Sequence, residues 1–82
     1  MNEITLETYM QVNRKYYKDN YKLNHNLGIS RVYDCKENYI IYKTEHILKL
    51  VEHNALSFNG TLDQARRYII NCIEKELLES EC

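Results

Sequence analysis

The chain has 82 residues, of which 44% are hydrophobic and 28% charged, and its formal net charge is −1. This length suits one domain with a small core, so residues 1–82 are expected to form a single domain. The charge balance lacks the positive excess typical of nucleic-acid-binding domains, and no apolar run approaches the roughly 20 residues of a membrane span. Met1–Thr5 lacks the basic and apolar blocks of a secretory signal, which predicts a cytoplasmic protein.

The first predicted element is a helix over about residues 5–22, with Thr5 or Asn2 as its N-cap. Its polar face is basic. The apolar and aromatic residues that recur at helical spacing are Leu6, Tyr9, Met10, Tyr16, Tyr17 and Tyr21. Gly28 and the asparagines before it favour a helix end, because they tolerate the left-handed backbone of a C-terminal exit.

A change to two-residue periodicity predicts the start of a sheet. Residues alternate in character over Ile29–Cys35, and Tyr39–Tyr42 is β-branched and aromatic. With Lys36–Asn38 as the loop, the two segments are expected to form an antiparallel hairpin.

Residues 45–53 permit two interpretations. Their periodicity favours a helix, but the segment is shorter than the roughly 12 residues of a marginal helix, and a hairpin alone is rarely stable. We therefore favour a third strand over about Ile47–Glu52. A turn at His53–Asn54 would then lead into a short fourth strand, Leu56–Phe58.

The last predicted element is a helix that begins at Thr61 and runs to about Leu78. Thr61 and Gln64 have the spacing of a capping box. One apolar stripe follows, formed by Leu62, Ala65, Ile69, Cys72, Ile73 and Leu77. The complete prediction is an α+β fold of order α-β-β-β(β)-α, in which two helices pack on an antiparallel sheet of three to four strands.

The residues that commonly carry chemistry form no recognisable motif. Cys35, Cys72 and Cys82 are odd in number and lack paired spacing, and the histidines lack the spacing of a metal site. A pair between Cys35 and His46 or His53 is conceivable, but no glycine-rich turn accompanies it. We therefore expect no catalysis, no metal and no cofactor.

A non-catalytic protein-binding module is the favoured function. Tyrosine and arginine are the commonest interface anchors, and the C-terminal glutamates Glu74, Glu76, Glu79 and Glu81 form either a solvated helix end or an acidic surface for a basic partner. The expected partner is a larger protein or ribonucleoprotein complex. The candidate partner-binding residues are Arg14, Tyr17, Arg66, Arg67, Glu76 and Glu79.

Two alternatives stay open. The first helix combines lysine and arginine with tyrosines that stack on bases in other proteins, which suggests a small nucleic-acid-binding regulator. The residues concerned are Arg14, Lys15, Tyr16, Tyr17, Lys18 and Tyr21. The third class is a homodimer with a structural role, because so small a core gains stability from oligomerisation.

A resemblance in kind supports the protein-binding hypothesis. The run from Phe58 to Ile69 resembles the strand, turn and capped helix that close many small α+β proteins of phages and mobile elements. The chain as a whole, compact and free of motifs, is similar in kind to phage-encoded inhibitors such as anti-CRISPR proteins. That resemblance implies an inhibitor or adaptor that acts on a larger host complex.

Overall fold

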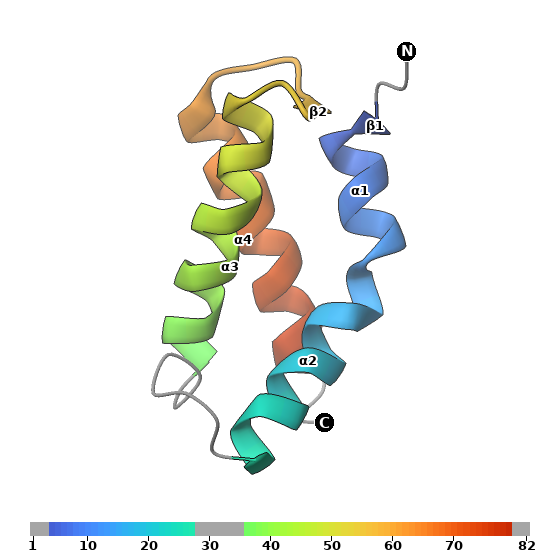
Figure 1. Ribbon diagram of the computed structural model, residues 1–82, viewed down its shortest axis with the longest axis vertical. Helices are drawn as coiled ribbons and strands as arrows, with labels where there is room; N and C mark the ends of the chain where they lie inside the picture. Colours follow the sequence, from blue (N-terminus) through green and yellow to red (C-terminus); the bar gives the residue numbers. More distant parts are fainter. Residues whose placement is uncertain (1–3, 28–35, 80–82) are drawn as a thin grey trace.

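The computed structural model describes residues 4–27 and 36–79, and within this part the chain is mostly helical (Figure 1). The elements are β1 (Ile4–Thr5), α1 (Leu6–Val12), α2 (Arg14–Leu27), α3 (Lys36–Glu52), β2 (Leu56–Ser57) and α4 (Leu62–Glu79). Helices α3 and α4 run antiparallel side by side, and α1 and α2 also pack against α4, with side chains of α2 reaching α3. The predicted α+β sandwich is therefore wrong.

The first predicted helix begins where expected, but it is broken in two at Asn13 and continues to Leu27 instead of ending near residue 22. The Thr5 hydroxyl caps α1 by accepting a hydrogen bond from the Thr8 amide at 3.1 Å, as the sequence predicted. At the other end, the amide side chain of Asn13 donates to the Tyr9 carbonyl at 2.8 Å, where a continuing helix would place only the backbone N–H. Asn13 thereby ends α1, and α2 starts at Arg14 in a new direction.

The predicted strands Tyr39–Tyr42 and Ile47–Glu52 are instead parts of α3. The buried residues of α3 are Tyr39, Ile40, Thr44, Ile47 and Leu48. Those positions follow steps of three and four, so one face of a helix meets α4. The proposed partner strand of the hairpin, Ile29–Cys35, lies outside the described residues.

The turn predicted at His53–Asn54 exists, but it ends a helix. Asn54 has a left-handed backbone with φ of 63°, and the Ala55 amide donates to the Leu50 carbonyl at 2.8 Å. The Asn54 amide donates to the Val51 carbonyl at 3.1 Å, which completes a Schellman motif. The fourth predicted strand shortens to β2, which pairs in parallel with β1, Ile4 opposite Leu56.

The last helix and its capping box are confirmed. The Gln64 amide donates to the Thr61 hydroxyl at 3.1 Å, and the Thr61 amide donates to the Gln64 side-chain oxygen at 3.0 Å. A Cβ on Gly60 would lie 2.5 Å from that oxygen, so the glycine leaves room for Gln64 to reach back. Ala65 and Ile69 of the predicted stripe are fully buried, but Leu62 at its start is exposed.

The core lies between α4 and the helices that pack against it. Its buried hydrophobic residues are Leu6, Met10, Tyr17, Tyr39, Ile40, Ile47, Leu48, Leu56, Ala65, Ile69, Ile73 and Leu77. Because α4 packs against α1, α2 and α3, it is the central element of the described part of the chain.

Replacing Thr61 with Ala is expected to lower the free energy of unfolding by about 1 kcal/mol, because one amide in the first turn of α4 loses its acceptor. Thr61→Ser is the matched control, since it keeps the hydroxyl. Urea unfolding followed by circular dichroism measures both. Equal midpoints for wild type and Thr61→Ala would contradict a stabilising role for the capping box.

Candidate protein-binding surface

Two exposed tyrosines and a lysine meet where α2 lies next to α3. Tyr16 on α2 and Tyr42 on α3 are 49% and 47% exposed. The Lys43 amine lies 5.3 Å from the centre of the Tyr16 ring and 5.9 Å from that of Tyr42. These distances are within the range of cation–π attraction, so Lys43 holds both rings near one point of the surface.

Helical spacing adds Leu23 to this surface. Tyr16, Asn20 and Leu23 are four and three residues apart, so they lie along one face of α2. That face is turned toward α3, because the Tyr39 hydroxyl donates to the Asn20 side-chain oxygen at 2.9 Å. Leu23 is exposed. We call Tyr16, Leu23, Tyr42 and Lys43 the tyrosine–lysine patch.

The patch rests on a buried aromatic pair. Tyr39, which is fully buried, packs edge-on against Tyr21 with ring centres 5.3 Å apart. The Lys43 amine also lies 5.8 Å from the centre of the Tyr39 ring. Side chains from α2 and α3 therefore fix each other beneath the patch, which limits the conformational entropy that a bound partner would have to remove.

The lysines of α2 form a separate surface. Lys15, Lys18 and Lys22 are three and four residues apart and share a face that lies roughly a third of a turn from the Tyr16–Leu23 face. Tyr17 and Tyr21 are buried and half-buried. The basic and aromatic residues that alternate in the sequence are thus not interleaved on the surface.

Two of the six predicted partner-binding residues bind each other. The Arg14 Nε atom lies 2.9 Å from Glu76 Oε2, which ties the start of α2 to α4. The Glu76 side chain is only 11% exposed, whereas that of Arg14 is 59% exposed. Glu76 therefore belongs neither to a solvated helix end nor to an exposed acidic surface, and its charge is already paired within the chain.

Tyr17 was also a predicted anchor, but it is only 3% exposed. Its hydroxyl donates to the Met10 sulfur at 3.9 Å. Burial raises the pKa of Tyr17 well above its ordinary value, with a further contribution from nearby Tyr9. Tyr17 is accordingly a protonated core residue at neutral pH.

Stability should therefore fall at alkaline pH in a way that depends on Tyr17. Because its pKa is higher in the folded protein than in the unfolded chain, the stability it contributes is complete below about pH 10 and is lost as the pH rises above that value. Denaturant unfolding of wild type and Tyr17→Phe at about pH 8 and about pH 11 measures the effect. We expect a smaller decrease for Tyr17→Phe, and equal decreases would contradict the assignment.

The remaining predicted anchors are dispersed along α4. Arg66 forms an ion pair with Glu45 of α3, and both side chains are about half exposed. Arg67 is exposed on the outer side of α4. Glu79 is the last residue of α4, and its side chain is outside the described part. Of the six predicted partner-binding residues, the structure brings Arg14 and Glu76 together as a bound pair.

The sequence reasoning missed Tyr42, Lys43 and Leu23. Tyr42 was assigned to a strand, where it would have been separated from Tyr16. A helical reading of residues 36–52 would have placed Tyr39 and Lys43 four residues apart on one face, with Tyr42 beside them. That spacing was the available signal.

No group of three or more metal-ligating side chains occurs in residues 4–27 and 36–79. Cys72 is half-buried on α4, and Cys35 lies outside the described residues, so the conceivable Cys35–histidine pair does too. None of the four described helices is both long and apolar enough to cross a membrane.

Comparison with known proteins gives no relative from which a function could be transferred. No protein-family model, curated protein or solved structure matches this chain.

Proposed function

We propose that this chain is a non-catalytic protein-binding module, an inhibitor or adaptor that acts in the cytoplasm on a larger protein or ribonucleoprotein complex. The tyrosine–lysine patch is its binding surface. The observation that supports this most is the gathering of half-exposed Tyr16 and Tyr42 around one lysine amine, on a base of packed aromatic rings. Tyrosine is a frequent interface anchor because it contributes a large contact area with few rotatable bonds.

The charges near the patch indicate the chemistry of the partner. The lysines of α2 lie on the separate face described above, and Arg14 is bound to Glu76. Lys43 adds a positive charge within the patch. A partner that presents an apolar or aromatic side chain with carboxylates around it would complement this surface, with the carboxylates acting mainly on association rate and orientation.

The separation of lysines and tyrosines on α2 favours a protein over nucleic acid. A single-strand-binding surface combines stacking rings with cations that follow the phosphates. Here Lys15, Lys18 and Lys22 lie on a different face from Tyr16, while Tyr17 is buried. Exposed apolar Leu23, two turns along the same face of α2 from Tyr16, has no role in phosphate binding but suits a protein interface.

The combined change Tyr16→Ala and Tyr42→Ala is expected to weaken partner binding about a hundredfold, because it removes two interface anchors. The tagged protein is used to capture its partner from native cells, and the affinity for that partner is then measured by calorimetry. Leu62→Ser is the matched control, since Leu62 is an exposed apolar residue at the start of α4. Equal affinities for wild type and the double variant would contradict the proposal, and capture of a second copy alone would indicate the homodimer.

The nucleic-acid alternative depends on the face formed by Lys15, Lys18 and Lys22. Labelled single- and double-stranded oligonucleotides, titrated at two salt concentrations, test it directly. We expect no binding at physiological salt. Micromolar, salt-sensitive binding that Lys15→Ala with Lys18→Ala removes would favour the alternative, because each lost phosphate contact lowers the salt dependence by about one unit of slope.

A further inference from the structure

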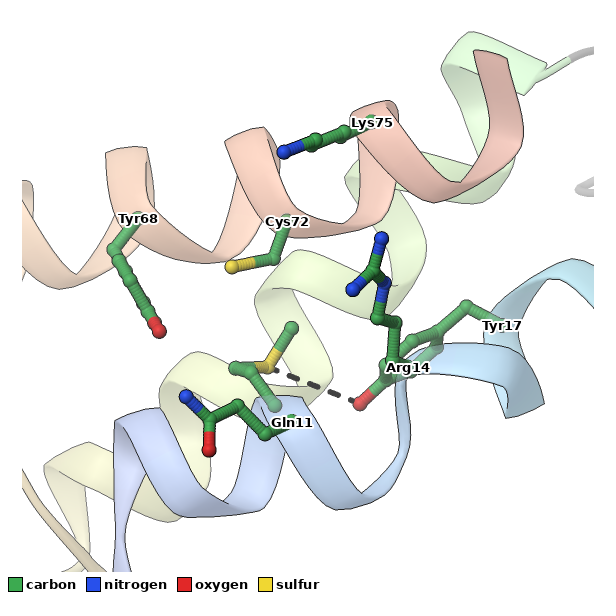
Figure 2. Close-up of a pocket in the computed structure, with 7 residues that line it drawn as sticks. Gln11, Arg14, Tyr17, Tyr68, Cys72 and Lys75 are labelled. Atoms are coloured by element: carbon green, nitrogen blue, oxygen red, sulfur yellow. Dashed lines mark hydrogen bonds between the residues drawn. The ribbon is translucent and has the colours of Figure 1, made fainter. Parts of the chain in front are cut away.

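A pocket of about 160 Å³ lies between the α1–α2 junction and α4. Figure 2 shows Tyr68, Cys72 and Lys75 of α4 on one wall and Gln11, Arg14 and Tyr17 on the other. Met10 also lines it. The volume is comparable to a protein cavity that holds one benzene molecule, about 150 Å³, so it is suited to a ligand no larger than a single ring with one small substituent.

One buried hydroxyl in this pocket donates to a weak acceptor. The Tyr17 hydroxyl, on a side chain that is 3% exposed, donates to the Met10 sulfur at 3.9 Å and also has a side-chain hydrogen bond with Tyr9. A thioether sulfur is a poor acceptor, and a buried hydroxyl gains more from an oxygen, above all a charged one. The site thus offers a donor that an anionic oxygen would satisfy better than the Met10 sulfur does.

The charges around the pocket favour an anion. Arg14 and Lys75 are both cationic, and Glu76, which is bound to Arg14, is the carboxylate that offsets one of them. Glu7 is a second carboxylate that acts on the Tyr68 hydroxyl. The described residues that line the pocket themselves include these two cations and no carboxylate. The Lys75 side chain is exposed and extends along the α4 wall of the pocket, above the sulfur of Cys72 (Figure 2).

The rest of the lining is apolar or aromatic. Met10 and Cys72 contribute sulfur and methylene groups, and Tyr68 contributes its ring. Burial, with a contribution from Cys72, raises the pKa of the Tyr68 hydroxyl, so it too is a donor at neutral pH. A bare inorganic anion would leave the apolar lining without contacts, whereas a ring or short aliphatic group would fill it.

We infer that this pocket binds a small organic carboxylate. Its carboxylate accepts a hydrogen bond from the Tyr17 hydroxyl and is attracted by Lys75 and Arg14, and its apolar body lies against Met10, Cys72 and Tyr68. This ligand site is additional to the proposed protein-binding surface and does not depend on it.

Benzoate is the probe that fits this description, and benzamide is its neutral counterpart of the same shape. Nuclear magnetic resonance titration of the whole protein is expected to show saturable benzoate shifts at residues 10, 17, 68, 72 and 75, with a dissociation constant in the millimolar range. Benzamide should bind about tenfold more weakly, because it lacks the charge that strengthens the hydrogen bonds.

Two variants and a control test which residues bind the carboxylate of benzoate. Lys75→Gln should weaken benzoate binding about tenfold, and Tyr17→Phe should weaken it by a smaller factor. Lys49→Gln removes a lysine from the exposed side of α3 and should change nothing. Lys75 is exposed, so its replacement does not endanger folding, and the test holds even if Tyr17→Phe is poorly folded.

An independent readout uses Cys72, with Cys35 and Cys82 replaced by Ser. Benzoate should slow the reaction of Cys72 with a thiol reagent, and benzamide at the same concentration should not. The proposal is overturned if benzoate gives no saturable shifts, if benzamide or inorganic phosphate binds as tightly as benzoate, or if Lys75→Gln and Lys49→Gln behave alike.

Discussion

Replacing Ile69 with Ala is expected to lower the free energy of unfolding by about 2 to 5 kcal/mol, because Ile69 is fully buried at the centre of α4 and its truncation leaves a cavity. A domain of this size has only about 5 to 15 kcal/mol in total, so the variant should be largely destabilised. Thermal and urea unfolding followed by circular dichroism measure the difference.

Leu62→Ala is the control, because the sequence pattern predicts that Leu62 is buried and the structure does not. Leu62 belongs to the same apolar stripe in the sequence, but the structure places it exposed at the first turn. We expect its truncation to change stability by well under 1 kcal/mol, as for ordinary surface substitutions. Similar losses for Leu62→Ala and Ile69→Ala would contradict the orientation of α4.

The second large loss of stability is expected when the charge of Glu76 is reversed. Glu76→Lys is expected to cost about 2 to 4 kcal/mol, because it places a cation in a nearly buried position beside Arg14; the loss is smaller than for a fully buried pair, since solvent screens the exposed arginine. Glu74→Lys, two residues earlier on the exposed side of α4, should cost little.

A second substitution tests whether the loss comes from this contact. Adding Arg14→Glu to Glu76→Lys restores opposite charges and should recover part of the lost stability, in a double-mutant cycle measured by urea unfolding. If the double variant is as unstable as the sum of the two single variants, Arg14 and Glu76 are not energetically coupled. Glu76→Lys is therefore a stability variant, and a loss of partner binding in it would not identify a binding residue.

The last helix could be predicted from the sequence because its signals are local. A capping box depends on Thr61 and Gln64 alone, and the four- and three-residue spacing of Ala65, Ile69 and Cys72 has no competing interpretation as a strand. The same holds for Thr5 as the cap of α1. The break between α1 and α2 could not be predicted in this way. It depends on a side-chain hydrogen bond of Asn13, which helical periodicity does not reveal.

Helix α3 was mistaken for strands because residue preference and periodicity disagree there. Tyr39–Tyr42 has β-branched and aromatic side chains, which are frequent in strands. In the structure, the neighbours Tyr39 and Ile40 are both buried, and the next two residues, Ile41 and Tyr42, are both exposed. A strand does not give this pattern, because its side chains alternate between two faces. Packing against α4 outweighed intrinsic preference. The helical periodicity of residues 45–53 indicated the right structure. These residues belong to a longer helix that begins at Lys36, so the objection that the segment is too short does not apply.

Only part of the candidate site could be predicted from the sequence. Residue type alone suggested tyrosine and arginine as anchors, but type does not distinguish buried Tyr17 from its exposed neighbour Tyr16. Nor can it show that Arg14 and Glu76, far apart in the sequence, neutralise each other. The tyrosine–lysine patch joins two helices, and it could not be assembled while one of them was assigned to a sheet.

The proposal that the patch binds a protein is tested most directly by photochemical cross-linking from Tyr42 in native cells. A photoreactive benzoylphenylalanine replaces Tyr42, and the same group at Leu62 serves as the control position. We predict an adduct with one protein from position 42, its loss when Tyr16→Ala is added, and no such adduct from position 62. Adducts with nucleic acid alone, or the same adduct from both positions, would contradict the proposal.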